Sequence, residues 1–342
     1  MSTASRPAPG PREALFEDGE AARTLPVCDH YSGVEARMRK SLELQAELGP
    51  VFDVTLDGED GAPVGGEHEH ALLMAELVNS PGNRWGRVGV RVPPVEHPAF
   101  EDMVSTVVGL AGHRLAYLMV PKPRGLVDLQ RAAEAIDAVT RDAALEQPIP
   151  LHALVETHGA LREVQALAAH PRVESLSFGL MDFVSAHRGA IPASAMSSTG
   201  QFEHPLVLRA KLEIAAACHG FGKTPSHCVV TEFKDEAALQ TAATLASRRL
   251  GYTRMWSIHP SQVRVIVDAF APSTAEVDQA IEILFAAQAA GWAPIRHRDT
   301  LHDRASYRYF WHVLQRAHQT SYAGGAQLPA EVCQAFFGGA AS

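Results

Sequence analysis

The stretch IPLHALVETHGALREVQALAAHPRVESLSFGLMD, residues 149–182, contains two apolar runs with a helical pattern between them. Residues 149–156 and 173–179 have the length and aliphatic content of buried strands, and apolar residues return at helical spacing in the intervening segment. A strand, a helix and a second strand in this order predict two parallel strands joined by a right-handed crossover. An acid follows each run, Glu156 and Asp182, although an unpaired carboxylate beside a core strand is costly.

The same alternation extends along most of the chain. Further apolar runs stand at residues 24–29, 51–57, 87–92, 114–120, 226–232 and 253–258, with amphipathic segments between them. Eight strand–helix units in about 240 residues favour an α/β fold of the (β/α)8 TIM-barrel type. The alternative is an open doubly wound sheet, but VCDHYSGVEARM lacks the glycine-rich turn that such a sheet carries after its first strand.

The pattern divides the chain into three predicted parts. Residues 1–22 form a polar N-terminal tail, residues 23–272 the catalytic barrel, and residues 273–342 a C-terminal helical extension that acts as a lid or an oligomer contact. Residues 183–224 are longer than an ordinary crossover, which predicts an insertion at the mouth of the barrel.

The composition limits the partners and the compartment. The 342 residues carry a formal net charge of -9, which disfavours a nucleic acid or an anionic membrane as partner. The cysteines, at positions 28, 218, 228 and 333, form no CxxC pair and are expected to be reduced thiols of a cytoplasmic protein. No apolar run reaches the roughly 18 residues of a membrane span.

Charged residues follow the apolar runs repeatedly. Active sites of such barrels lie at the C-terminal strand ends, so these side chains would meet in one place. In chain order they are Asp57, Glu59, Asp60, Arg91, Lys122, Glu156, Asp182 and His259. Carboxylates about 4 Å apart repel by about 4 kcal/mol at an effective dielectric constant of about 20, so such a cluster calls for a cation.

The ligand types indicate which cation fits. Oxygen ligands favour Mg²⁺ or Mn²⁺ over zinc, and Mg²⁺ commonly uses one or two protein carboxylates. We therefore expect Glu156 and Asp182 to hold the metal. Arg91 and Lys122 supply positive charge for an anionic substrate, and an arginine can bind a carboxylate through two hydrogen bonds.

Seven short motifs follow one another along the chain: VFDVTLDGEDG, VGVRV, MVPKP, ALVETHGAL, SFGLMDF, IHPSQV and DAFAPSTAEVDQA. In these motifs the chain resembles the citrate lyase β-subunit and malyl-CoA lyase group of the HpcH/HpaI aldolase superfamily. The resemblance implies a (β/α)8 barrel, Mg²⁺ held by Glu156 and Asp182, and an oxoacid carboxylate held by Arg91.

The resemblance also implies the reaction and its other residues. It implies a carbon–carbon lyase or aldolase that acts on a small hydroxyacid or its acyl-CoA ester, assembled as a homotrimer or hexamer. Asp57 and Glu59 would be catalytic together with Arg91, and Lys122, Gly179 and His259 would contact the substrate. An aspartate from the C-terminal segment of the next subunit would transfer the proton, with Asp303 as the best match and Asp299 as the alternative.

Some positions depart from the family pattern. Glu67 and His68 stand where a lysine and an Ala-Arg pair usually follow the second strand, and Pro93 stands where an asparagine usually follows Arg91. The residues expected to meet a CoA phosphate are therefore partly missing. Two alternative functions remain, an Mg²⁺-dependent oxoacid decarboxylase or acyl-CoA thioesterase on the same barrel, and a non-catalytic lyase-like binding subunit.

Overall fold

The computed structural model describes residues 9–17, 24–62, 64–322 and 324–338. The chain divides into two compact units. Residues Thr24–Phe270 form one, here called the barrel unit. The residues before Thr24 and those from Ala271 onward form the other, here called the terminal unit.

Within the described residues, eight parallel strands close into a barrel in chain order, and the last strand pairs with the first. They are β1 (Cys28–Ser32), β2 (Phe52–Asp57), β3 (Val88–Arg91), β4 (Leu118–Val120), β5 (Leu151–Val155), β6 (Val173–Phe178), β7 (Thr224–His227) and β8 (Arg254–Ser257). The closed ring confirms the predicted (β/α)8 barrel and excludes the open sheet.

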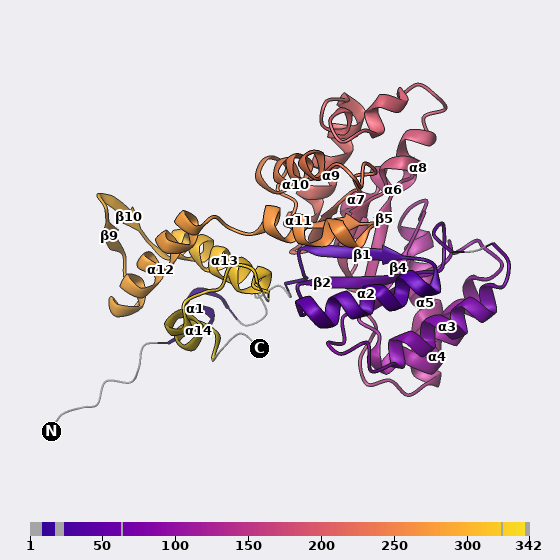
Figure 1. Ribbon diagram of the computed structural model, residues 1–342, viewed down its shortest axis with the longest axis horizontal. Helices are drawn as coiled ribbons and strands as arrows, with labels where there is room; N and C mark the ends of the chain where they lie inside the picture. Colours follow the sequence, from indigo (N-terminus) through magenta and orange to yellow (C-terminus); the bar gives the residue numbers. More distant parts are fainter. Residues whose placement is uncertain (1–8, 18–23, 63, 323, 339–342) are drawn as a thin grey trace. The chain divides into compact units, whose positions relative to one another are not determined.

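Helices follow the strands and cover the outside of the barrel (Figure 1). They are α2 (Glu35–Leu48), α3 (Glu67–Asn79), α4 (Phe100–Ala111), α5 (Leu126–Asp142), α6 (His158–Arg162), α7 (Val164–Ala169), α9 (Pro205–Gly220), α10 (Glu236–Arg249) and α11 (Pro260–Phe270). The predicted insertion after β6 contains α8 (Leu180–Ser185) and two short 3₁₀ turns, η2 (Ala193–Met196) and η3 (Gly200–Phe202).

Two strands end three or more residues away from the predicted end, and β4 (Leu118–Val120) begins four residues later than the predicted 114–120. The first was expected at residues 24–29, but β1 runs from Cys28 to Ser32, because Asp29 lies inside the strand and pairs with Arg254 at 3.0 Å. A paired acid need not end a buried strand. The seventh was expected at 226–232, but β7 ends at His227, where its pairing with β8 also ends.

A polar layer fills the middle of the barrel. Arg254 is fully buried, and its guanidinium pairs with Asp53 at 2.6 Å and with Asp29. The Thr55 and Tyr117 hydroxyls lie 2.7 and 3.0 Å from the same Asp29 oxygen and 2.6 Å from each other, within hydrogen-bond distance. Since these residues come from β1, β2, β8 and the position just before β4, the layer ties strands together across the interior.

The terminal unit has a separate apolar core. It contains α1 (Pro11–Leu15), α12 (Thr274–Ala289), the hairpin β9 (Ile295–His297) and β10 (Thr300–His302), α13 (Arg304–Thr320) and α14 (Ala330–Phe337). Leu15, Ile283, Trp311 and Val332 are among the buried residues of this core. The predicted C-terminal helical region is therefore present, and the boundaries at residues 22 and 272 stay predictions.

No helix in the described residues has the length and apolarity that a membrane crossing requires.

Candidate active site at the C-terminal end of the barrel

The C-terminal ends of β2 and β3 bring Asp57 and Arg91 together. The two residues are register partners, so the sheet itself sets their separation. Arg91 donates from Nε and Nη2 to the two carboxylate oxygens of Asp57, at 2.7 and 2.5 Å. Its Nη1 pairs with Glu59 at 3.0 Å. The guanidinium is thus fixed by two acids on a buried side chain, which raises the pKa of Arg91 against the opposing effect of burial.

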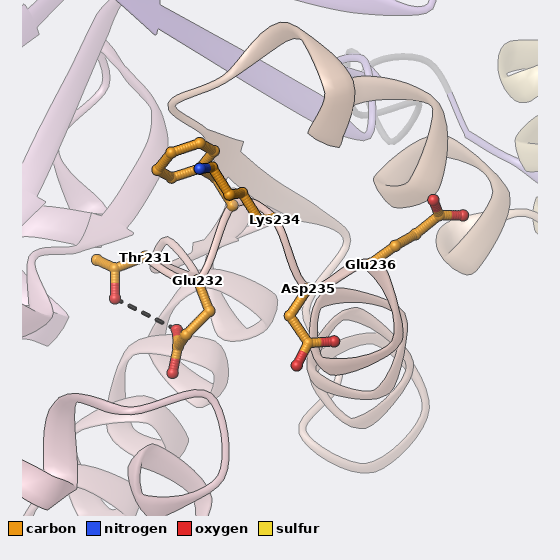
Figure 2. Close-up of a pocket in the computed structure, with 6 residues that line it drawn as sticks. Thr231, Glu232, Lys234, Asp235 and Glu236 are labelled. Atoms are coloured by element: carbon orange, nitrogen blue, oxygen red, sulfur yellow. Dashed lines mark hydrogen bonds between the residues drawn. The ribbon is translucent and has the colours of Figure 1, made fainter.

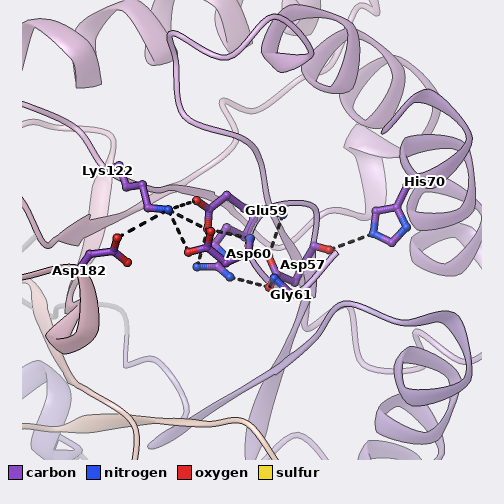
Figure 3. Close-up of polar contacts among 8 residues, drawn as sticks. Asp57, Glu59, Asp60, Gly61, His70, Lys122 and Asp182 are labelled. Carbon is purple, nitrogen blue, oxygen red and sulfur yellow. Dashed lines mark hydrogen bonds and ion pairs between the residues drawn. The ribbon is translucent and has the colours of Figure 1, made fainter. Parts of the chain in front are cut away.

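Asp57 also shapes the loop that follows β2. Its carboxylate accepts hydrogen bonds from the backbone N–H groups of Glu59 and Gly61, at 3.0 and 2.9 Å. A Cβ at Gly61 would lie 2.3 Å from an Asp57 oxygen, so glycine is needed for this approach. His70 of α3 bonds the Asp57 carbonyl at 2.9 Å (Figure 3). Asp57 therefore positions both Arg91 and the Glu59 loop.

Lys122, just after β4, joins the acids of several strand ends. Its ammonium lies 2.5 Å from Glu59, 2.9 Å from Asp60 and 3.8 Å from Asp182 (Figure 3). These carboxylates raise the pKa of Lys122 although burial opposes the change. Its φ of 50° is in the left-handed region, where a non-glycine residue is strained. In this conformation its backbone N–H donates to Glu156 at 2.8 Å.

Glu156 follows β5 and is 3% exposed. Burial raises the pKa of Glu156 to about 8, and the neighbouring Asp182 carboxylate adds to the effect. A Cβ at Gly179, after β6, would lie 2.1 Å from a Glu156 oxygen, so the bare glycine makes room for this carboxylate. The structure thus places Gly179 against Glu156, and its expected contact with a substrate stays a prediction.

The donor set at Glu156 and Asp182 fits Mg²⁺. Within the described residues, no group of three or more His, Cys, Asp and Glu side chains could hold a metal. Mg²⁺ needs only one or two carboxylates and takes its other ligands from water and substrate. Glu156 is buried and raised in pKa beside a second acid, while the Asp182 side chain is 43% exposed and open to solvent. A divalent cation would relieve the repulsion between the two.

His259 has its contacts with the loops after β7 and β8. It follows β8, accepts from or donates to the Ser261 hydroxyl at 2.8 Å, and stacks on Phe233 at 5.1 Å between ring centroids. It lines a hollow of about 470 Å³ together with Phe233, Lys234 and Leu239. A neighbouring hollow is lined by residues 231–236 (Figure 2). His259 therefore belongs to the rim formed by the loops after β7 and β8.

Asp303 and Asp299 belong to the terminal unit. Asp303 caps α13, and its carboxylate accepts hydrogen bonds from the backbone N–H groups of Ala305 and Ser306, at 3.0 and 3.3 Å. Asp299 lies in the turn between β9 and β10 and pairs with Arg296. Their catalytic role stays a prediction, and the cap gives Asp303 a local structural role as well.

Sequence reasoning did not single out Tyr31 and Trp256. Both are buried aromatic residues within 4.5 Å, measured between ring centroids, and Arg91 lies over the Tyr31 ring at 5.5 Å. In sequence they look like ordinary core residues of β1 and β8. Strand alternation from the polar Asp29 and Arg254 could have placed them on the inner face.

Comparison with known proteins gives consistent matches. The model of the HpcH/HpaI aldolase/citrate lyase family matches residues 52–260. A citrate lyase of Burkholderia xenovorans, known as a crystal structure, is 53% identical with a TM-score of 0.82, over 96% of this chain and all of that one. An L-malyl-CoA/beta-methylmalyl-CoA lyase of Cereibacter sphaeroides is 27% identical, over 78% of this chain and 88% of its own.

A more distant structure shares the fold. Protein CitE from Mycobacterium tuberculosis, in complex with magnesium, acetoacetate and coenzyme A, is 20% identical with a TM-score of 0.66. The match covers 87% of this chain and 99% of that one.

Proposed function

Because the chain belongs to the HpcH/HpaI aldolase/citrate lyase family, we propose that it is an Mg²⁺-dependent carbon–carbon lyase acting on a hydroxyacid or its acyl-CoA ester. The observation that carries the proposal is the meeting of Glu156 and Asp182 around Lys122, with Arg91 held by the same loop acids. This arrangement offers a metal site and an anion site on one rim of the barrel.

Arg91 is the residue that would hold the substrate carboxylate. Of its five N–H groups, two donate to Asp57, from Nε and Nη2, and Nη1 forms an ion pair with Glu59 that takes up one more. One N–H on each terminal nitrogen remains, and such a pair can bind a carboxylate with two hydrogen bonds. Asp57 would thus act by orienting Arg91.

Glu156 and Asp182 would hold the Mg²⁺ ion. When bound, the ion supplies Lewis-acid polarisation of a substrate carbonyl or hydroxyl oxygen. Lys122 keeps the two ligands in place, because its backbone N–H bonds Glu156 and its ammonium faces Asp182. Its charge also partly offsets that of the surrounding acids before the metal binds.

Cleavage of a hydroxyacid requires a group that takes the hydroxyl proton. Within the barrel unit Glu59 is the candidate, because burial raises its pKa against the effects of Arg91 and Lys122. Asp303 of a neighbouring subunit in a trimer or hexamer is the second candidate, with Asp299 as its alternative. Replacement of each acid by its amide, with metal affinity as the control, separates these assignments.

In this proposal the substrate is either a free hydroxyacid or its CoA thioester. Relatives are named for malyl-CoA and citramalyl-CoA, which favours the thioester. In this chain, however, α3 begins with Glu67, His68 and Glu69, and His68 pairs with Asp102 at 2.9 Å. An acidic helix start does not attract a phosphate, so a CoA substrate would place its phosphates elsewhere.

The test compares Mg²⁺ affinity of the wild type with that of Glu156→Gln, Asp182→Asn and the control Asp60→Asn, by calorimetry. Asp60→Asn removes an acid of the same cluster that is not an expected ligand. Loss of a ligand should weaken Mg²⁺ binding by at least about tenfold, which is about 1.4 kcal/mol. The melting temperature without metal should change little, since each amide keeps the shape of its acid.

Wild-type Mg²⁺ affinity in Glu156→Gln and Asp182→Asn would refute the metal site. A product assay on hydroxyacids and their CoA esters then decides the reaction. Release of an oxoacid or aldehyde with its carbon partner supports the lyase. Release of CO₂ or of free CoA alone would instead identify a decarboxylase or thioesterase, and absence of both turnover and ligand binding a non-catalytic subunit.

A further inference from the structure

Tyr31 and Trp256 lie inside the barrel, one layer nearer to the active site than the Asp29–Arg254 layer. Each stands two residues beyond a member of that layer on its own strand, and residues two apart share a face of a strand. Together with Met119 of β4 and Leu154 of β5 they form one buried cluster. Strands β1 and β5 are not neighbours in the sheet, so this contact runs through the interior.

Two hydrogen-bond donors in this layer have no partner in the part of the chain that the structure describes. The Tyr31 hydroxyl and the Trp256 indole N–H are both buried and make no hydrogen bond among the described residues. Tyr117, one layer below, differs: its hydroxyl bonds Asp29 at 3.0 Å and Thr55 at 2.6 Å. Buried polar groups without a partner are uncommon and destabilising, so the two donors call for an explanation.

The position of Arg91 indicates the direction from which a partner would come. Its guanidinium carbon lies 5.5 Å from the centre of the Tyr31 ring, so Tyr31 is directly beside the residue that would hold the substrate acid. Below Tyr31 the interior is filled by the bonded Tyr117 layer. A partner for Tyr31 must therefore come from the substrate side, past Arg91.

We propose that the Tyr31 hydroxyl and the Trp256 indole N–H contact the substrate and donate hydrogen bonds to its second oxygen-bearing group. The inference rests on the proposed function, because it takes Arg91 as the site of the acid. It defines the substrate as an acid with a keto, hydroxyl or carboxylate oxygen on the side away from Arg91. Its apolar part would lie against Met119 and Leu154.

If Tyr31 has this role, removal of the Tyr31 hydroxyl and removal of the Tyr117 hydroxyl should have different effects on the melting temperature. Removal of the Tyr31 hydroxyl takes away a donor that is unpaired in the free protein, so the melting temperature should hold or rise. Removal of the Tyr117 hydroxyl breaks two buried hydrogen bonds and should lower it. A residue that lowers the stability of the free protein and improves ligand binding is typical of a functional site.

The experiment compares Tyr31→Phe with the matched control Tyr117→Phe, and adds Trp256→Phe for the second donor. Melting temperatures are measured without ligand. Binding is measured by calorimetry with Mg²⁺ and oxaloacetate, acetoacetate or pyruvate, which are ligands of related structures. Tyr31→Phe should weaken oxoacid binding by about tenfold and leave Mg²⁺ affinity unchanged, whereas Tyr117→Phe should lower the melting temperature with little change in oxoacid affinity.

The outcomes separate this inference from the function on which it rests. A wild type that binds an oxoacid, with equal affinity in Tyr31→Phe, would overturn the role of Tyr31 alone. A lower melting temperature in Tyr31→Phe without loss of affinity would likewise identify the residue as structural. Unchanged binding in Trp256→Phe would remove the second donor. A wild type that binds neither Mg²⁺ nor any oxoacid overturns the proposed function and this inference together.

Discussion

At the scale of single residues, the charges on the barrel rim hold one another in place. Arg91 and Lys122 share Glu59, while Asp57 fixes Arg91 through two hydrogen bonds. Substitution effects within such a network are not additive, because its members contact one another. Each role is therefore tested by a single substitution with a matched control.

Arg91→Lys should raise KM for the acid by about tenfold or more, because a point charge replaces a planar group with two parallel donors. The melting temperature should change little by comparison with this rise in KM. The measurement is steady-state kinetics together with thermal unfolding.

Arg87→Lys is the matched control for that prediction. Arg87 also pairs with a barrel aspartate, Asp53, but it precedes β3 and so lies at the opposite end of the strand from Arg91. The Arg87→Lys substitution should lower the stability of the protein and leave KM unaltered. An unchanged KM in Arg91→Lys, or an equal rise in Arg87→Lys, would contradict the assignment of Arg91 to the substrate.

Lys211 of α9 gives a prediction on pH dependence. It is fully buried, donates to the Gln201 side chain at 2.7 Å and lies 4.0 Å from the centre of the Phe202 ring. Burial lowers the pKa of Lys211 to about 8. Between about pH 8 and about pH 10.4, Lys211 binds more protons in the unfolded chain than in the folded protein. The contribution of Lys211 to the free energy of unfolding therefore rises with pH in this range.

Lys211→Met removes this dependence. The stability of the variant relative to the wild type should be highest at neutral pH and should fall by about 2–3 kcal/mol on going to about pH 10. Denaturant unfolding at several pH values measures the difference, in which thiols and phenols other than the neighbouring Cys228 cancel. Lys40→Met, at an exposed lysine, serves as the control for loss of a lysine charge. A constant difference for Lys211→Met would contradict the prediction.

At the scale of elements, the short strands owe their inward packing to a few small residues. Gly89 in the middle of β3 faces Tyr117, and a Cβ there would lie 2.3 Å from the Tyr117 ring. The ring cannot move away without breaking its hydrogen bonds to Asp29 and Thr55. The space at Gly89 is thus part of the polar layer.

Gly89→Ala should therefore lower the free energy of unfolding by about 1–3 kcal/mol or more, as overpacking of a core does. Gly109→Ala is the control, because an added Cβ at this exposed helical position of α4 would lie 4.0 Å from its nearest neighbour. That substitution should stabilise the protein by up to about 1 kcal/mol. Equal effects at the two glycines, measured by denaturant unfolding, would show that the Tyr117 contact is unimportant.

The arrangement of the strands also explains which site residues could be predicted from the sequence. The ends of parallel strands lie together, so a charge after each apolar run sufficed to predict Arg91, Lys122, Glu156 and Asp182 as neighbours. The predicted bounds of β1 were wrong because Asp29 was taken as the end of the strand. Its partner, Arg254, stands on the last strand. Pairings between such distant residues leave no local pattern. Tyr31 and Trp256 were missed because a buried aromatic looks the same in a core and in a site.

At the scale of the whole molecule, the chain folds as two compact units with separate cores. The family resemblance, the closed barrel and the assignment to lyases are confirmed by the family match, the strand order and the named relatives. The roles of the site residues stay predictions, because they depend on ligands and on the arrangement of subunits.

Leu15→Ala tests the separation of the two units. Leu15 of α1 is 2% exposed in the core of the terminal unit, so the cavity left behind should cost about 2–5 kcal/mol. We expect calorimetry to show two unfolding transitions, of which this substitution lowers only one. Leu176→Ala, at a fully buried position of β6, should lower the other. A single transition that both variants shift equally would show that the units unfold together.

Arg254 has a consequence for biosynthesis. Its guanidinium binds Asp53, 201 positions earlier, and the carbonyl of Pro26, 228 positions earlier. At a translation rate of about 5–20 residues per second, a nascent chain waits about 10–40 s between making Asp53 and making the arginine that completes the ring. During this interval β1 has no β8 to pair with and leaves a sheet edge open. We expect polypeptides released before codon 254 to keep this edge and to be degraded faster than the full-length chain.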